Sequence, residues 1–203
     1  MQELEDIPMD KKPKMLTWAD FTPDFPVWKL HPAGCTLATK ELAPGVYALI
    51  SSIPGVDNAG FVVGEKGVLV IDAHISVPMA RQIQERVREV TDKPILFLVN
   101  SNYHGDHTFG NCAFPAETLV IQQRETAART PYLEEEMAFM LPGVNNDYKV
   151  FEGVTLRRPD ITELVAHGTR RGLVVSLTPS GTAAVTLDKL RALRDAGLAR
   201  LAV

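Results

Sequence analysis

The sequence predicts an α/β fold, and three observations carry this prediction. Two uninterrupted apolar runs, residues 68–71 and 94–99, have the form of strands buried on both faces. Between them, residues 77–90 place apolar side chains at three- and four-residue spacing, as in an amphipathic helix. Both runs end in polar residues, namely Asp72 and the loop 100–107. A helix that joins two buried strands is the crossover unit of a parallel sheet, so these polar groups should meet at one sheet edge.

The other elements follow from local patterns along the chain. Residues 45–50 and 59–63 read as strands, and residues 119–121 as a further short strand. Residues 125–140 are helical in pattern, with an interruption at Pro131 and with the acidic residues 134–136 as a solvated charge run. We also expect a strand over residues 150–156 and a terminal helix over residues 187–201.

Residues 1–40 are rich in proline and form a predicted N-terminal arm, which precedes a domain over residues 41–203. The arm contains Trp18 and Trp28, which we expect to pack on the surface of the domain. A flap over a substrate pocket and a contact that forms a homo-oligomer are the alternatives. His31 also lies among the prolines of the arm and is expected to be exposed.

The composition excludes several classes of protein. The chain has 203 residues, 21 of them basic and 25 acidic, so its net charge is −4 and no bulk basic charge attracts nucleic acid. It lacks an apolar run of about 18 residues and an apolar leader segment, so we expect a cytoplasmic protein with no membrane partner. Its two cysteines, Cys35 and Cys112, are too few for a disulfide scaffold.

One dense cluster of metal-competent side chains follows the second buried strand. His104, Asp106 and His107 lie within four residues, and Gly105 permits a tight bend between them. Imidazole and carboxylate groups together suit zinc, or iron or manganese in a site richer in oxygen. We therefore expect this loop to bind a metal ion or to take part in catalysis.

The loop resembles the metal-binding loop of the metallo-β-lactamase fold superfamily, whose pattern is His-x-His-x-Asp-His after an apolar strand. Residues 42–47, 57–63, 67–72 and 91–95 fall in the order of that family's first strands and helix, so the resemblance covers residues 42–125. It implies a four-layer αββα sandwich with one or two zinc ions at the edge of its sheets. It also implies hydrolysis of a small-molecule ester, thioester, amide or lactam by a metal-activated water.

The resemblance assigns roles residue by residue. His104 matches a ligand of the first metal, and Asp106 and His107 match ligands of the second, with Asp106 also orienting the attacking water as a catalytic residue. Asn102 takes the place of the first histidine, which weakens the first site. His167, within residues 165–172, loosely resembles the next metal ligand; an exposed loop histidine is the alternative.

The second half of the chain departs from the family pattern. The strand pair expected before His167 and the later aspartate and histidine ligands are missing, so the sandwich is expected to be incomplete there. A natural remnant and a disrupted reading frame both fit this departure.

Three further residues lie in or near the predicted site. Asp72 matches a strand-end aspartate that supports the metal-binding loop of the family. His74 reads as a polar loop residue, and a position facing the same crevice is the alternative. Tyr103 either donates a hydrogen bond to substrate or packs against the loop. The sequence thus favours a metal-dependent hydrolase. An inactive remnant with a weakened metal site and an interaction module that uses the arm are its rivals.

Overall fold

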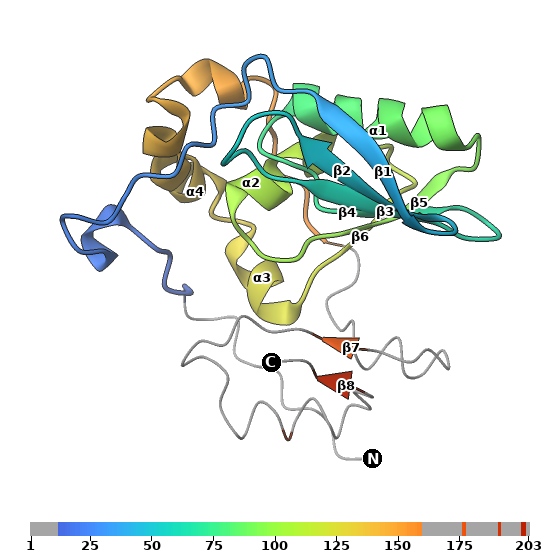
Figure 1. Ribbon diagram of the computed structural model, residues 1–203. Coiled ribbons are helices and arrows are strands. Elements are labelled where there is room, and N and C mark those ends of the chain that lie inside the picture. Colours follow the sequence, from blue (N-terminus) through green and yellow to red (C-terminus); the bar gives the residue numbers. More distant parts are fainter. Residues whose placement is uncertain (1–11, 160–175, 178–190, 192–199, 202–203) are drawn as a thin grey trace. The chain divides into compact units, whose positions relative to one another are not determined.

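The computed structural model describes residues 12–159, 176–177, 191 and 200–201. Residues 37–121 build one six-stranded sheet (Figure 1). Its strands are β1 (Leu37–Ala43), β2 (Val46–Ser51), β3 (Ala59–Val63), β4 (Val68–Ile71), β5 (Ile95–Val99) and β6 (Leu119–Ile121), and they lie in sequence order. The pairings from β1 to β4 are antiparallel, whereas β4–β5 and β5–β6 are parallel. The predicted α/β fold is confirmed.

Helix α1 (Val77–Val90) is the crossover between the parallel strands β4 and β5, as the apolar spacing predicts. Ser76 caps its N-terminus, because its Oγ accepts a hydrogen bond from the backbone N–H of Met79, 3.4 Å away. The helix buries Met79, Ala80, Ile83 and Val87 in the same core as the inward-facing residues of the sheet. Those sheet residues include Leu49, Phe61, Val70 and Leu98, each with no exposed surface.

Short helices and loops follow β5 and β6 and cover the end of the sheet where the loop 100–107 lies. They are α2 (Gly105–Thr108), η2 (Phe109–Ala113), α3 (Arg124–Arg129), α4 (Leu133–Met140), η3 (Leu141–Val144) and η4 (Tyr148–Phe151). The expected interruption at Pro131 separates α3 from α4. These segments enclose a second apolar cluster that includes Ile75, Phe109, Phe139 and Met140.

The aromatic side chains of the N-terminal segment pack against α4. A single turn, η1 (Trp18–Asp20), places the indole N–H of Trp18 3.0 Å from the backbone oxygen of Phe139, to which it donates a hydrogen bond. The ring centroids of Trp18 and Trp28 lie 5.5 and 5.6 Å from that of Phe139. The expected packing of both tryptophans on the domain is therefore present.

Four expectations about the elements are wrong. Residues 37–40 belong to β1 rather than to the arm. Residues 150–156 contain the end of η4 and a loop instead of a strand, because the Asp147 carboxylate accepts the N–H of Lys149 and starts a helical turn. The last two residues of the expected helix 187–201, Arg200–Leu201, form strand β8, which pairs in parallel with β7 (Ser176–Leu177). The rest of that expected helix, apart from Arg191, lies outside the described residues.

The fourth correction concerns the acidic run on α4. Glu134 and Glu135 are exposed as expected, but Glu136 is 4% exposed. The run is therefore not a uniformly solvated face, since one of its three carboxylates is turned into the protein. Its partners belong to the loop 100–107 and are described below.

Candidate metal centre

The parallel pairing of β4 and β5 brings the two predicted polar segments together. Both strands end at the same sheet edge, where the backbone N–H of Asp72 donates to the oxygen of Val99 over 2.9 Å. The next N–H, that of Ala73, donates to the oxygen of His107, also over 2.9 Å. The segment after β4 is thus hydrogen-bonded to the loop after β5. Ligand sites of such sheets usually lie at this end of the strands.

Asp72 orients this loop through its carboxylate. One oxygen accepts the backbone N–H of Ser101 at 2.7 Å, and the other lies 2.9 Å from Nδ1 of His107. Because a carboxylate only accepts, Nδ1 of His107 carries the hydrogen, and its Nε2 is the nitrogen left for a metal. Asp72 adopts a left-handed backbone conformation with φ of 61°, which is uncommon for a residue with a Cβ.

Asp57, Asp106 and His107 form the candidate metal site. One potential ligand atom from each residue lies within 4.8 Å of the other two. Oδ1 of Asp106 is 3.8 Å from Nε2 of His107. This oxygen is buried and has no hydrogen-bond partner among the described residues. A buried oxygen of this kind needs a partner. Two carboxylates and one imidazole therefore fit a single divalent ion.

The three side chains of this group perturb one another's pKa values. Burial, together with the negative charge of Asp106, raises the pKa of Asp57 to about 8. Burial lowers the pKa of His107, but the hydrogen bond and charge of Asp72 outweigh it, so that pKa rises to about 9. A bound cation would favour the ionised form of both Asp57 and Asp106.

His74 holds the backbone at Asp57. It lies in the loop between β4 and α1, as expected of a polar loop residue, and it is buried there with 1% of its surface exposed. Nδ1 accepts the backbone N–H of Ile75 at 2.9 Å, so Nε2 carries the hydrogen and donates it to the Asp57 carbonyl oxygen at 3.1 Å. Burial lowers the pKa of His74 to about 4 and keeps its ring neutral.

His104 lies beside the three-residue group but is not part of it. Its Nδ1 is 2.9 Å from Oε1 of Glu136, and the same oxygen accepts the N–H of Gly105 at 3.0 Å. Asn102, at the first histidine position of the family pattern, accepts the backbone N–H of His104 at 2.7 Å through Oδ1. Its side chain thus supports the turn. His167, the fourth predicted ligand, lies outside the described residues.

A cavity of about 300 Å³ opens onto this site. Its polar lining comes from Asp57, Asp106 and His104. Its apolar lining comes from Trp28, Leu30 and Met140. Its remaining lining residues are Lys29 and Gly55. Residues 28–30 come from the N-terminal segment, which therefore forms part of the wall of this cavity.

Two residues of the site, Asp57 and Glu136, were not predicted from the sequence. Asp57 stands alone in the turn between β2 and β3, and only folding brings it to the metal loop, so local spacing could not reveal it. Glu136 did leave a signal. It lies three residues from Leu133 and from Phe139, so it occupies the apolar face of α4, where an isolated carboxylate indicates a buried partner.

The sequence of this chain matches the model of a known protein family. Residues 53–190 match the family model of the metallo-β-lactamase superfamily. The chain belongs to this superfamily. The N-acyl homoserine lactonase of Bacillus cereus is 33% identical over 110 residues, which are 50% of this chain and 42% of that protein. The N-acyl homoserine lactonase of Bacillus thuringiensis is 27% identical over 176 residues, 81% of this chain and 64% of the relative.

Among solved structures, a metallo-β-lactamase from Pontibacter korlensis is similar with a TM-score of 0.47 and 15% identity. The similarity covers 63% of this chain and 52% of that one. The chain spans 42% and 64% of the length of the two lactonases.

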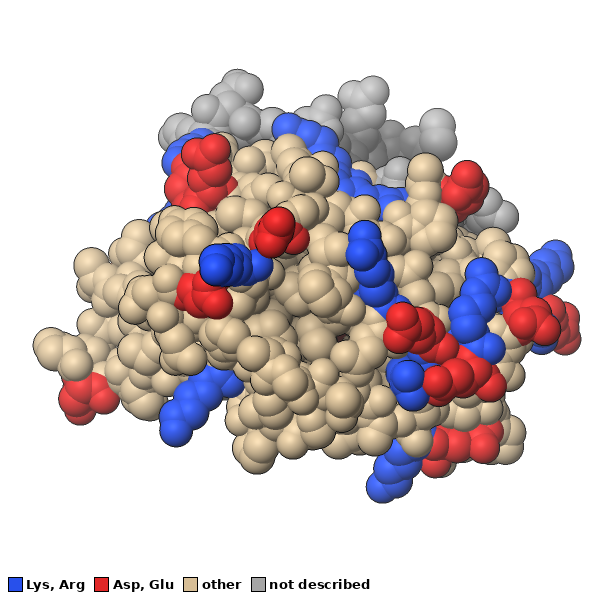
Figure 2. Space-filling view, turned by 90° about the horizontal axis from the view of Figure 1, so that it is seen from above, with Lys and Arg blue, Asp and Glu red and all other residues tan. Residues whose placement is uncertain are grey.

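The surface of the described part carries charges of both signs. On the face seen in Figure 2, acidic and basic side chains are interspersed around a broad uncharged area. Among the described residues, no helix is both long enough and apolar enough to cross a bilayer.

Proposed function

We propose that this member of the metallo-β-lactamase superfamily is a metal-dependent hydrolase of a small ester, with a lactone as the favoured form. The observation that carries the proposal is the group of Asp57, Asp106 and His107, whose ligand atoms converge within 4.8 Å beside a cavity of about 300 Å³. The lactonases among its relatives support the choice of substrate class.

Asp57, Asp106 and Nε2 of His107 would hold the ion, which we expect to be zinc; iron or manganese also suits two carboxylates and one imidazole. A bound divalent ion lowers the pKa of a coordinated water from about 15.7 towards about 7 and polarises a carbonyl oxygen. The resemblance to the family also gives Asp106 the task of orienting the attacking water. Its buried Oδ1, which has no other partner among the described residues, is free for either task.

The remaining residues of the site prepare it for this chemistry. Asp72 keeps the hydrogen of His107 on Nδ1, so that Nε2 stays available. Trp28, Leu30 and Met140 form apolar walls that would exclude water and accept an acyl chain. Lys29, which lines the same cavity, would attract an anionic or carbonyl group of the substrate.

Metal analysis and hydrolysis assays on the same preparation test the proposal. Protein stripped with EDTA should regain about one zinc or manganese ion per chain, measured by mass spectrometry, and should then hydrolyse acyl lactones and aryl esters. Asp57→Asn and Asp106→Asn should reduce both metal content and turnover. Asp92→Asn, an exposed aspartate away from the site, should change neither.

Protein that binds no metal and turns over no ester under these conditions overturns the proposal. That result would favour the alternative reading, an inactive member of the family with a weakened metal site. Turnover that survives both Asp57→Asn and Asp106→Asn would contradict the assignment of these residues in particular.

Self-association through the N-terminal segment and a cytoplasmic location are further proposals from the sequence. Light scattering coupled to size exclusion should give a mass above that of one chain. A deletion of residues 1–36, which stops before β1, should then restore the mass of a monomer. A monomeric full-length chain would contradict the proposed association.

A further inference from the structure

We propose that Glu136 is a positioning residue that fixes the ring of His104 and turns its Nε2 towards the substrate cavity. The inference rests on the proposed function, because it concerns the same cavity. Glu136 belongs to α4, is 4% exposed and reaches back to the metal loop. Its Oε1 contacts both Nδ1 of His104 and the N–H of Gly105, at 2.9 and 3.0 Å.

The chemistry of the two partners selects one tautomer of His104. An ionised carboxylate has only acceptor oxygens, so the ring nitrogen that faces Glu136 must carry a hydrogen. The hydrogen of a neutral His104 therefore sits on Nδ1, and Nε2 keeps a free lone pair. This nitrogen makes no hydrogen bond within the described part of the chain.

Aromatic neighbours hold the plane of the ring. The centroid of the His104 ring lies 4.1 Å from that of Tyr103 and 5.4 Å from that of Phe139, with an interplanar angle of 27° to the latter. Phe139 is the third residue after Glu136 on the same helix, so α4 supplies both the hydrogen-bond acceptor and the stacking surface. Rotation out of this plane would break both contacts, and a 180° flip of the ring would break the hydrogen bond to Glu136.

The result is a hydrogen-bond acceptor next to Asp106 in the lining of the cavity. The family resemblance makes this histidine a metal ligand, but in this chain Asn102 replaces the first ligand and Glu136 occupies Nδ1. His104 is therefore placed to accept a hydrogen bond from the substrate or from water in the cavity. Glu136 acts through His104 and does not itself line that cavity.

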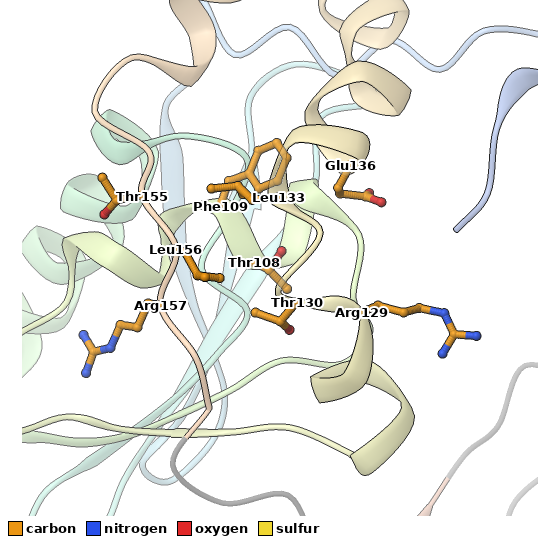
Figure 3. Close-up of a pocket in the computed structure, with 9 residues that line it drawn as sticks. All are labelled: Thr108, Phe109, Arg129, Thr130, Leu133, Glu136, Thr155, Leu156 and Arg157. Carbon is orange, nitrogen blue, oxygen red and sulfur yellow. The ribbon is translucent and has the colours of Figure 1, made fainter. Parts of the chain in front are cut away.

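The second oxygen of Glu136 also argues against a purely mechanical anchor. Oε2 is buried and has no hydrogen-bond partner among the described residues. Glu136 lines a separate small cavity of about 20 Å³ with Thr108, Arg129 and Thr130 (Figure 3), which has room for about one water molecule. A buried carboxylate oxygen without a hydrogen-bond partner is a costly way to join α4 to a loop. An apolar residue would join them at lower cost, but it could not select the tautomer of His104.

Glu136→Gln tests the role, with Glu134→Gln as the matched control on the exposed face of α4. The first readout is the nitrogen NMR spectrum of the metal-free protein, in which the tautomer of each of the five histidines is visible. Wild-type His104 should carry its hydrogen on Nδ1, and Glu134→Gln should leave that signal unchanged. Glu136→Gln should populate both tautomers, because a carboxamide both donates and accepts.

The second readout is the hydrolysis of an ester or lactone by the metal-loaded protein. Glu136→Gln should lower kcat by about 10-fold, as expected when one hydrogen bond to a charged group is lost, with KM changed less than kcat. Glu134→Gln should leave both constants unchanged.

The two readouts fail independently. Wild-type protein with the hydrogen of His104 on Nε2 overturns the proposal whatever the variants do, even where Glu136→Gln does not fold. A folded Glu136→Gln protein with an unchanged tautomer and an unchanged kcat overturns it as well. Wild-type protein without hydrolysis would refute the proposed function, whereas the tautomer would still decide the role of Glu136.

Discussion

Asp57→Asn should make the metal-free protein more stable while it removes the metal site. In the folded protein the pKa of Asp57 is raised to about 8 by burial and by the charge of Asp106, against an ordinary value of 3.8. The folded state thus binds this proton more tightly than the unfolded state does. Stability contributed by the protonated carboxyl is therefore lost progressively as the pH rises from about 4 to about 8.

The size of the effect follows from the pKa difference. At pH 7.5 the carboxyl is 7.5 − 3.8, or about 3.7 pH units, above its ordinary pKa. At about 1.4 kcal/mol per unit this sets an upper limit of about 5 kcal/mol. Since the side chain is partly exposed, solvent screens the charges, and we expect Asp57→Asn to gain about 1–3 kcal/mol at pH 7.5. At pH 5 the gain should fall below about 1 kcal/mol.

Urea unfolding of EDTA-treated protein at both pH values measures this gain. Thermal melts with and without zinc complete the experiment: wild-type protein should be stabilised by zinc, and Asp57→Asn much less. Asp92→Asn serves as the control, since it removes one exposed carboxylate from the same chain. An Asp57→Asn protein that is less stable than wild type at pH 7.5, or equally stabilised by zinc, would refute the reasoning.

Three further predictions follow from single contacts. Burial lowers the pKa of His74 to about 4, so metal-free wild-type protein should lose up to about 3 kcal/mol as the pH falls from 6.5 to 4. His74→Asn should not show this loss of unfolding free energy between pH 6.5 and 4 in urea titrations, and asparagine tolerates the φ of 68° at this position. An equal loss in the variant and in wild type would contradict a neutral buried ring. Asn102→Ala should lower stability by about 1 kcal/mol because the N–H of His104 loses its acceptor, and an unchanged melting temperature would speak against that contact. Leu98→Ala should cost about 2–5 kcal/mol in chemical denaturation, since this side chain has no exposed surface; a loss below about 1 kcal/mol would be inconsistent with its place in the core.

Much of the fold was accessible from local patterns because the relevant forces act over a few residues. The apolar runs at β4 and β5, the helical spacing of α1 and the break at Pro131 each report a local preference, and the structure has these elements where they were expected. The prediction of a strand over residues 150–156 was wrong because their apolar side chains suit a strand and a buried helical turn equally well. The cap provided by Asp147 decided for the turn.

The candidate site was accessible only where its residues are neighbours in the sequence. His104, Asp106 and His107 share one loop, so their chemistry can be read together. Asp57 is separated from Asp106 by two strands, a helix and a third strand, and Glu136 comes to Gly105 from another helix. No local pattern encodes such an encounter, since it depends on how complete elements pack.

The amino-acid sequence by itself determined the α/β class, the edge of the sheet where the polar residues gather and the family resemblance, because periodicity and short motifs are properties of contiguous chain. The tertiary structure alone decided which donors converge. It joined Asp57 to Asp106 and His107, placed residues 28–30 over the cavity and turned Glu136 towards His104. The physical reason is that burial and electrostatic coupling depend on distance in space, and distance in space between remote residues is fixed only when the core has packed.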